Sequence, residues 1–551
     1  MSALQFPSVH RRRFLAGSAT ALGSAALLAA CGPSGSGGGG GGGNGGTSAE
    51  AMPTYQKIDV EVEPDLVGDE VVQDVYFSYP NPPFTSVEHE TGSGGDLRAM
   101  IITYNPPPTP LDKNSYWELM NSELGVNYIP EIVSSTDYEQ KFSTVIAGGG
   151  DLPDIIQCPL WMSLPRMNAL IDNQFEDLTE HLGGDAVLKY PNLANIPAYA
   201  WSQAISKGKL WGIPVTRTLF PSVMYIRTDI SSDAGFDEAP KGQEEFLEWG
   251  KAMTDKSKQR YAFSAADGGW MTNTTNGMYE VPNAWQLDGE TLTESFEHDS
   301  YFEGLDFVKK VWELGYMHPD TPGMSVAQQK TLFWQGRVAA CEDGIAWYPD
   351  NINYPDTIMG GRAPWTKDGS KVHAMQGSGI FSVNALKRGL DPAKVEEILN
   401  IMDYLAAPFG SEEYTKIAFG IEGEQYTMVD GSPQPDTERS QDRAINLGYV
   451  SAAPQAQYAS APVLRDTFTG VHALQTDIAT GLVPNPIQGL RSDTQEKNGQ
   501  YTTAIEDDRN DYILGRKTLD ELKATIKEYQ DKVQAKIKEE LLEALRERGD
   551  I

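Results

Sequence analysis

Aromatic residues that stand beside turn-forming residues are the part of this sequence with the clearest chemical potential. Flat aromatic rings stack on the apolar C–H faces of sugar rings, while adjacent Asn, Asp, Glu and Arg side chains bond the sugar hydroxyls. Most aromatic residues in a chain of 551 residues belong to a core, so we retain as candidates those in loops at the ends of predicted strands. The aromatic residues beside turns are Tyr104, Trp161, Trp211, Trp270, Trp285, Trp334, Trp347 and Tyr348.

Signatures of catalysis are scarce by comparison. The sequence contains no P-loop, G-x-S-x-G or H-E-x-x-H motif, and its seven histidines and three cysteines are scattered without zinc-binding spacing. With 77 acidic residues, some carboxylates lie close together in any fold, so a glycosidase-like pair stays open but gains no support. We therefore predict a binding protein without enzymatic activity, metal or cofactor, and keep a secreted glycoside hydrolase as an alternative.

The charge balance excludes some partners. The chain has 77 Asp and Glu against 44 Lys and Arg, a formal net charge of −33. Nucleic acid is a poor partner for such a chain, because binding it depends on Lys and Arg that neutralise phosphates. Cys158 and Cys341 could form one disulfide, but their apolar or strand-like surroundings favour two buried thiols.

The N-terminal region has the pattern of an export signal. Arg11, Arg12 and Arg13 precede a weakly apolar run that is too short and too polar to span a membrane, so residues 1–30 are predicted to be a signal peptide. The run of arginines resembles the twin-arginine export signal, with a general secretion signal as the alternative.

Cys31 ends the sequence LAAC, which resembles the lipobox of bacterial lipoproteins. Diacylation there, for example with palmitate, would supply the two lipid chains that stable anchoring requires. The glycine-rich residues 31–50 would then form a flexible tether. We therefore expect the protein on the extracytoplasmic face of the cell membrane, attached through Cys31.

Downstream of an irregular, proline-rich segment, residues 51–95, the pattern becomes that of an α/β fold. LRAMIITY at 97–104 is typical of a buried strand, and strand and helix patterns then alternate. Near the C-terminus, Thr518 and Glu521 have the spacing of a capping box, and an apolar stripe follows that predicts a helix closing over its own lobe. About 450 folded residues exceed one core and predict two lobes.

Several motifs, in order, resemble one known family. They include GGGDLPDII at 148–156, GKLWGIPV at 208–215, AADGGW at 265–270 and LFWQGRVAACEDGIAW at 332–347. The resemblance is to the extracellular solute-binding proteins of bacterial ABC importers, the maltose-binding-like family 1, in its long lipoprotein members. It implies a two-lobe, type II periplasmic-binding-protein-like fold with a hinge and an interlobe cleft. Lobe 1 would hold 96–216 and 373–435, and lobe 2 would hold 217–372 and 436–551.

The resemblance also implies a function: a monomer that binds an oligosaccharide or related sugar by hinge closure and delivers it to ABC permease subunits in the membrane. An oligopeptide-binding protein and a surface adhesion module are further alternatives. Some long relatives carry a calcium loop where this chain reads TDKSKQRYAF, which has too few carboxylates, so we expect no such site. The ligand-binding residues that the resemblance implies are Tyr104, Asn105, Trp161, Arg217, Trp270, Trp347, Tyr348, Glu424 and Tyr426.

Overall fold

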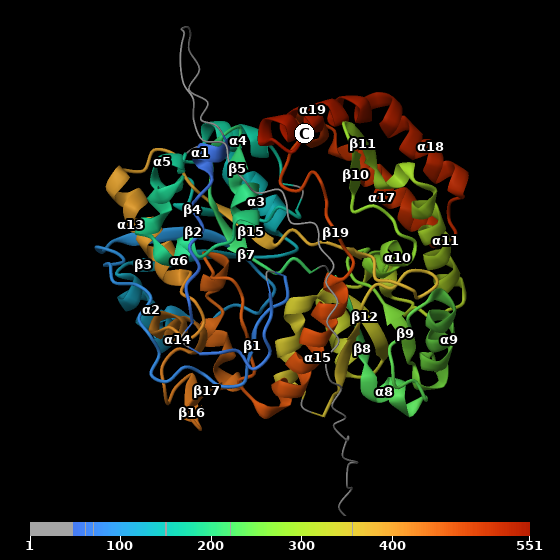
Figure 1. Cartoon of the computed structure of the whole chain (residues 1–551), viewed down its shortest axis with the longest axis horizontal. Coiled ribbons are helices and arrows are strands. Elements are labelled where there is room, and N and C mark those ends of the chain that lie inside the picture. Colours follow the sequence, from blue (N-terminus) through green and yellow to red (C-terminus); the bar gives the residue numbers. More distant parts are fainter. Residues whose placement is uncertain are drawn as a thin grey trace, which may run out of the picture. The chain divides into compact units, whose positions relative to one another are not determined.

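The computed structural model describes residues 48–551 apart from 61, 70, 149, 150, 163, 221 and 355 (Figure 1). Cys31 and the predicted signal peptide lie outside the described residues, as does all but the end of the predicted tether. No helix in the part of the chain that the structure describes is long and apolar enough to cross a membrane.

The first sheet has five strands in the order β3-β2-β4-β15-β7. Strands β3 and β4 run parallel to β2, whereas β15 runs antiparallel to both β4 and β7. The carboxyl ends of β2, β4 and β7 therefore meet the start of β15 at one edge of the sheet. The strands are β2 (Asp96–Thr103), β3 (Asn127–Ser134), β4 (Ile155–Cys158), β7 (Ile213–Thr216) and β15 (Ile380–Leu386).

Local signals in the sequence set the first crossover between strands. The side chain of Asn114 accepts a hydrogen bond from the Trp117 N–H and so caps the helix that follows β2. Gly125 ends this helix with φ of 63°, a backbone conformation that glycine adopts without steric strain. The helices that contribute to this half are α2 (Ser115–Leu124), α3 (Tyr138–Ala147), α4 (Met167–Asn173), α6 (Pro191–Ala194), α13 (Pro392–Leu405) and α14 (Glu412–Phe419).

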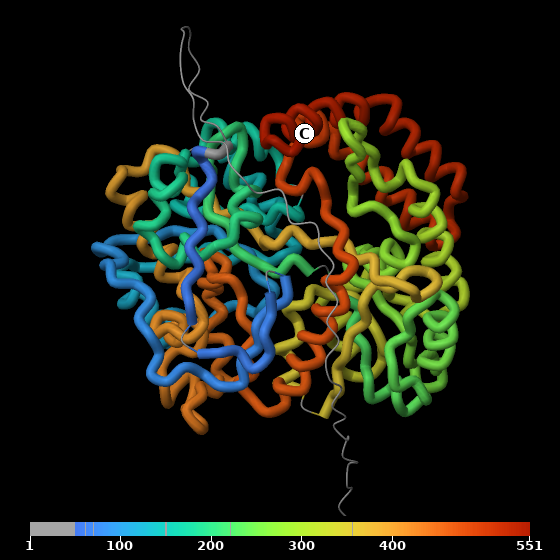
Figure 2. Tube along the Cα trace, in the orientation of Figure 1, coloured from blue at the N-terminus to red at the C-terminus, as the bar shows by residue number. Residues whose placement is uncertain are grey.

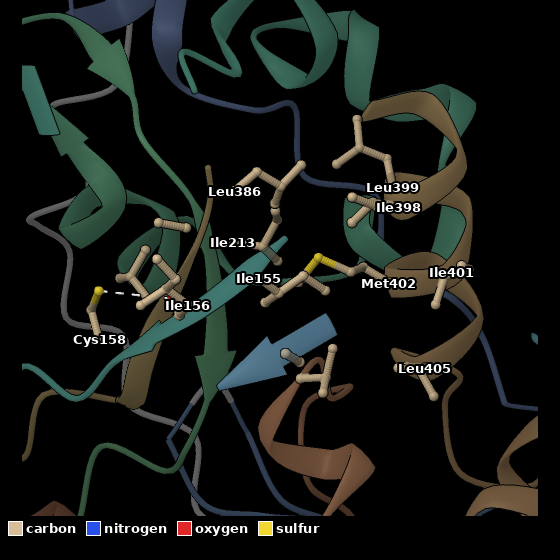
Figure 3. Close-up of a cluster of buried hydrophobic side chains, with 14 of the residues drawn as sticks. Ile155, Ile156, Cys158, Ile213, Leu386, Ile398, Leu399, Ile401, Met402 and Leu405 are labelled. Carbon is tan, nitrogen blue, oxygen red and sulfur yellow. Dashed lines mark hydrogen bonds between the residues drawn. The ribbon is translucent and has the colours of Figure 1, made fainter. Parts of the chain in front are cut away.

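The core of the first half lies between the sheet and these helices. Figure 3 shows Ile155 and Ile156 of β4 with Ile213 of β7 and Leu386 of β15, and the side chains of α13 such as Met402 beside them. Ile445, Leu447 and Val450 also pack into this core, although they come from a segment predicted for the second lobe.

The second sheet has four strands in the order β13-β8-β12-β9. Strand β12 runs parallel to β9, and β8 runs antiparallel to both β12 and β13. The strands are β8 (Ser222–Arg227), β9 (Tyr261–Ser264), β12 (Val338–Gly344) and β13 (Met359–Arg362). The elements packed around them include α8 (Thr228–Asp233), α9 (Gln243–Met253), α10 (Thr272–Met278), α11 (Asp299–Glu313), α12 (Val326–Trp334), the 3-10 helix η7 (Ile345–Asn353) and α15 (Pro462–Ala479).

The C-terminal helices cover the second core, as predicted. The capping box of Thr518 and Glu521 is present at the start of α18, and Leu522, Ile526 and Ile537 are buried against the second sheet's helices. The helices of this cover are α17 (Gly499–Ile513), α18 (Leu519–Tyr529) and α19 (Ala535–Arg548), with a π-helical turn at Gln530–Gln534 between the last two.

A hydrogen bond network ties this cover to the hairpin of β10 (Trp285–Asp288) and β11 (Thr291–Glu294). The carboxylate of Glu294 accepts from the Tyr529 hydroxyl at 3.0 Å and from the Gln534 amide at 3.1 Å. Burial raises the pKa of Glu294 to about 7, the two hydrogen bonds lower it, nearby Glu297 raises it and Lys538 lowers it.

Two connections between the sheets run side by side. The Arg217 N–H, just after β7, donates to the Gly379 carbonyl just before β15 at 2.8 Å, and the Gly377 N–H donates to the Leu219 carbonyl at 2.8 Å. These paired segments lead from the first sheet into the second and back again.

The segment between residues 52 and 95 is largely irregular and packs on elements of both halves (Figure 2). The carboxylate of Glu413 in α14 accepts from the Ser86 N–H at 3.0 Å. Farther back along the chain, the Gln73 N–H donates to the Gln475 side chain in α15 at 2.9 Å. Strand β1 (Val75–Tyr76) pairs parallel with β18 (Gln457–Tyr458).

The remaining elements are short. They are the hairpin β16 (Tyr426–Val429) and β17 (Ser432–Pro435), the pairs β5 (Ile205–Ser206) with β6 (Lys209–Leu210) and β14 (Ala374–Met375) with β19 (Leu482–Val483), and the helices α1 (Ser48–Ala51), α5 (Thr179–Leu182), α7 (Ala198–Trp201) and α16 (Asp493–Lys497).

Candidate ligand-binding site

Four aromatic rings form a cluster at the edge of the first sheet where β2 and β4 end and β15 begins. Phe381 lies at its centre, with ring centroids 5.9 Å from Trp161, 6.4 Å from Tyr104 and 4.9 Å from Tyr449. Tyr104 is 47% exposed and Trp161 is 54% exposed. This cluster, which we call the aromatic platform, presents apolar rings at the carboxyl ends of the strands, where α/β sheets bind ligands.

Arg217 adds a cation to the platform from the end of β7. Its guanidinium lies 4.9 Å from the Phe381 ring centroid and 5.8 Å from that of Tyr449. One of its nitrogens donates to the Thr216 carbonyl at 2.8 Å. Burial lowers the pKa of Arg217, and interaction with Tyr449 and Tyr104 opposes that change. Stacking on two rings holds the guanidinium in place.

A cavity of about 670 Å³ extends from the platform residues Arg217 and Tyr449. Asn105, just after β2, lines it from the first half, and Ile345 and Ala346 of η7 line it after β12 of the second half. The segment between Arg443 and Ser460 supplies much of the remaining wall. The cavity thus lies between residues that follow strands of both sheets and along a segment that connects them.

Several buried polar groups in this wall have no hydrogen bond partner among the described residues. They are the Arg443 Nη1, the Asn446 Nδ2, the Ser451 Oγ, the Gln457 Oε1 and the Tyr458 hydroxyl. Buried polar groups in proteins are normally bonded, and leaving one unsatisfied costs about 1–3 kcal/mol. A polar ligand that bonds these groups would recover that energy.

Two acidic residues, Asp343 and Asp267, lie at or just after the ends of strands of the second sheet. Asp343 lies in β12, where its carboxylate is 3.3 Å from the Lys330 ammonium, and Asp267 is exposed in the loop after β9. Burial raises the pKa of the Tyr104 hydroxyl, Arg217 lowers it, and Asp267 and Asp343 raise it. The two acids are therefore near enough to Tyr104 to act on it across the space between the sheets.

Glu342, the first acid of the EDG motif, has a structural role in the adjoining helix. Its carboxylate accepts from the Thr274 N–H at 2.7 Å and from the Asn273 N–H at 3.3 Å, at the start of α10. It thus satisfies two N–H groups that the helix leaves free at its N-terminus.

Trp270 belongs to the second core and offers no free face. The side chain is 1% exposed, packs at right angles on Trp312 and donates from its indole N–H to the Asn510 side chain at 2.9 Å. The sequence placed it in a loop after a strand, but that loop folds inward, with φ of 50° at Trp270 itself.

Trp347 and Tyr348 belong to η7, and both side chains are buried in a hydrophobic cluster with Tyr225 of β8. Trp347 is 3% exposed and packs within 5.2 Å of the rings of Tyr225, Phe333 and Trp334. Tyr348 is 2% exposed and packs on Tyr225. The backbone that carries them does line the cavity through Ile345 and Ala346, so the predicted loop is at the site although the predicted rings are not.

Glu424 and Tyr426 lie in the loop after α14 and in β16, and neither is among the residues that line the cavity. Glu424 accepts a hydrogen bond from the Ser115 hydroxyl at 2.5 Å. Tyr426 is buried beside Phe419. The structure therefore brings together Tyr104, Asn105, Trp161 and Arg217 of the predicted set.

Three residues at this site were not predicted: Phe381, Tyr449 and Arg443. Phe381 stands in GSGIFSVNAL, a motif of the family resemblance, and could have been found by asking which aromatic residue lies at the start of that strand, where it is the second residue. Nothing in the local sequence distinguishes Tyr449 or Arg443, because their place depends on a segment that returns to the first sheet from far along the chain.

The two cysteines of the folded part do not form a disulfide. Cys158 and Cys341 are buried free thiols, which confirms the preferred prediction. Burial raises the pKa of both thiols. Among the described residues, no group of three or more His, Cys, Asp or Glu side chains is arranged to hold a metal ion.

Comparison with known proteins gives consistent results. Residues 121–385 match the family of bacterial extracellular solute-binding proteins. The polygalacturonan/rhamnogalacturonan-binding protein YtcQ of Bacillus subtilis (strain 168) is 25% identical over 489 residues, which are 84% of this chain and 94% of that protein. Lipoprotein LipO of the same organism is 23% identical over 460 residues, 77% of this chain and 87% of LipO. The crystal structure of the alginate-binding protein AlgQ2 without calcium superposes with a TM-score of 0.60 at 13% identity, covering 82% of this chain and 97% of AlgQ2.

Two sheets joined by paired crossing segments, with a cavity lined from both, define an α/β protein of the two-lobe, type II periplasmic-binding-protein-like fold. The family resemblance carried by the sequence motifs is confirmed. The chain is similar to the bacterial extracellular solute-binding proteins, whose family model matches its residues 121–385. The matched family, YtcQ and AlgQ2 are described as binding proteins rather than enzymes.

Proposed function

We propose that this protein is the lipid-anchored, extracytoplasmic binding component of an ABC importer and that it binds an oligosaccharide. The observation that carries this proposal is the aromatic platform, where Tyr104 and Trp161 offer exposed rings beside the polar cavity. Sugars present both an apolar face and many hydroxyls, and the platform and the cavity suit these two features respectively. The names of YtcQ and AlgQ2, which bind polysaccharides, support the same ligand class.

The proposed mechanism is closure of two lobes about their crossing segments. Lobe 1 would comprise 96–216 and 373–435, together with the segment that carries Ile445, Leu447 and Val450 into its core, and lobe 2 would comprise 217–372 and the rest of 436–551. The sugar stacks on Trp161 and Tyr104, and polar groups near Asn105 and Arg217 bond its hydroxyls. Because only the closed form contacts the sugar from both lobes, the sugar shifts the population toward that form. The closed monomer then docks on the permease subunits, which take up the sugar.

Attachment through Cys31 keeps the binding protein near its permease. Two acyl chains on that residue would provide a stable anchor, and the glycine-rich tract gives the folded part reach. The relative LipO is named as a lipoprotein, which supports this assignment. A Cys31→Ala variant should lose incorporated palmitate label and move from the membrane fraction into the medium. Retention of the label by this variant would contradict the assignment.

The experiment that tests the proposed function is calorimetric titration with panels of oligosaccharides and of peptides, followed by small-angle scattering with the tightest ligand. We expect at least one oligosaccharide to bind in the micromolar range and no peptide to do so. The radius of gyration should decrease with the sugar while the mass stays that of a monomer. Analysis of reducing ends after incubation separates binding from hydrolysis, since a glycoside hydrolase would release them. Binding by peptides alone, or no closure with the bound sugar, would refute the proposal.

A further inference from the structure

The charge of the cavity wall differs from that of the chain as a whole. The sequence has a net charge of −33, yet the described residues that line the cavity include no Asp, Glu or Lys and two arginines, Arg217 and Arg443. A cavity whose ionised side chains are only guanidinium groups, in so acidic a protein, has a local excess of positive charge where a ligand would lie.

No carboxylate among the described residues forms an ion pair with Arg443, although burial lowers its pKa and nearby Asp442 and Asp436 raise it. Arg443 ends the 3-10 helix Thr437–Arg443, and the nearest acid along the chain is Asp442. The Asp442 carboxylate is occupied elsewhere, since it accepts from the Thr109 hydroxyl at 2.7 Å and lies 3.0 Å from the Arg439 guanidinium. The Arg443 Nη1 is buried without a hydrogen bond partner. Arg443 as a whole is half-buried, but a buried N–H of a cation that lacks an acceptor is costly, so an anion that reaches the Nη1 gains a charge-assisted hydrogen bond.

Arg217 is in a similar position at the platform. No carboxylate among the described residues lies within 4.0 Å of its guanidinium, whose recorded hydrogen bond goes to the Thr216 carbonyl. Two rings hold its plane, and the Tyr449 side chain also bonds it, so only the N–H groups that remain after these contacts are available to a ligand. Near Tyr104, the carboxylate of Asp343 pairs with Lys330, whereas Asp267 has no ion pair among the described residues.

The unsatisfied groups between the two arginines also favour an acceptor-rich ligand. The Asn446 Nδ2 and the Arg443 Nη1 can only donate, and the hydroxyls of Ser451 and Tyr458 can donate or accept. Among the unsatisfied groups of this wall, the Gln457 Oε1 alone is restricted to accepting, so donors outnumber acceptors. Carboxylate oxygens accept such bonds and gain from the charge of the arginines.

We propose, on the basis of the function proposed above, that the cavity selects saccharides that carry carboxylate groups, namely uronic-acid oligosaccharides, and that Arg443 and Arg217 bind their carboxylates. The platform then stacks the sugar rings, and the two arginines fix the chain's position along the cavity. Asp267, which lies near Tyr104, limits the preference by repelling an anion there.

The test uses two probes that share one skeleton: trigalacturonate, which carries three carboxylates, and its fully methyl-esterified form, which carries none. Titrated into the full-length protein, trigalacturonate should bind roughly tenfold or more tightly than the ester, as expected for a charge-assisted pair. Arg443→Gln should remove most of that difference by weakening the acid about tenfold while leaving the ester within about twofold. Arg516→Gln removes the same charge from an exposed ion pair with Asp511 and should change neither affinity.

The outcomes separate this inference from the proposed function. If the ester or another neutral saccharide binds as tightly as trigalacturonate, the selectivity for acids is refuted while sugar binding stands. An Arg443→Gln variant that weakens both probes equally also refutes the charge role, because a misfolded or reshaped cavity would do this. Failure of every saccharide to bind refutes both proposals together.

Discussion

Replacing Trp161 by alanine tests the platform directly, because this ring is 54% exposed and lies tilted by 57° against Phe381, with ring centroids 5.9 Å apart. A Trp side chain that is half exposed can still bury roughly 100 Å² of apolar surface under a sugar. At about 25 cal/mol per Å² this amounts to about 2.5 kcal/mol, or roughly a 70-fold weaker dissociation constant for Trp161→Ala. The fold should lose less than about 1 kcal/mol, since the ring contributes little to the core.

The assay is calorimetric titration of the wild type, Trp161→Ala and Trp161→Phe with the tightest saccharide, alongside urea unfolding of each. Trp161→Phe keeps a smaller flat ring, so its affinity should lie between those of the other two. An affinity of Trp161→Ala within about threefold of the wild type would refute stacking at this ring. A large loss of stability would show instead that the ring supports the fold, contrary to its exposure.

Buried positions give predictions of a different kind. Trp270→Ala should lower the free energy of unfolding by about 3–5 kcal/mol, because it leaves a cavity in the second core and an unpaired Asn510; urea unfolding measures this, and a loss under about 1 kcal/mol would contradict it. Burial raises the pKa of Glu294 from 4.5 to about 7, so the folded state holds a proton that the unfolded state has released. The free energy of unfolding should therefore fall by about 3 kcal/mol as pH rises from 4.5 to about 7. In Glu294→Gln, the free energy of unfolding measured from pH 4.5 to 8 should depend less on pH. An unchanged slope in this variant would mean that another group causes the pH dependence. In a Cys31→Ser chain, the buried thiols Cys158 and Cys341 should react with a maleimide only after unfolding, and rapid labelling of the native protein would oppose their burial.

The alternation of strand and helix patterns was enough to predict the fold class. LRAMIITY became β2, and the capping box at Thr518 did begin a helix that covers the second core. These features are local. A buried strand needs a run of apolar residues, and a capping box needs Ser or Thr at the N-cap with Glu or Gln three residues later. Neither depends on where distant parts of the chain lie.

The site could be predicted only in part, because burial is decided by distant contacts. Tyr104 and Trp161 follow β2 and β4 into solvent, whereas Trp270 and Trp347 follow β9 and β12 and turn inward against Trp312 and Tyr225. All four residues have similar local sequence: an aromatic ring in a loop after a strand. What separates them is whether an element from elsewhere covers the loop, and α11 and β8 do so in the second half.

The site and the hinge share their elements. Arg217 is the first residue after β7 and begins the segment that crosses to β8. Its backbone N–H donates to the Gly379 carbonyl, which lies on the segment that returns to β15. A ligand that pulls on the Arg217 guanidinium therefore acts on the connection about which the lobes would turn. Phe381 follows Gly379 closely, so the ring at the centre of the platform is fixed to the same pair of strands. One pair of segments carries both the ligand contacts and the connection between the lobes. We therefore expect ligand binding to be coupled directly to lobe closure through these segments.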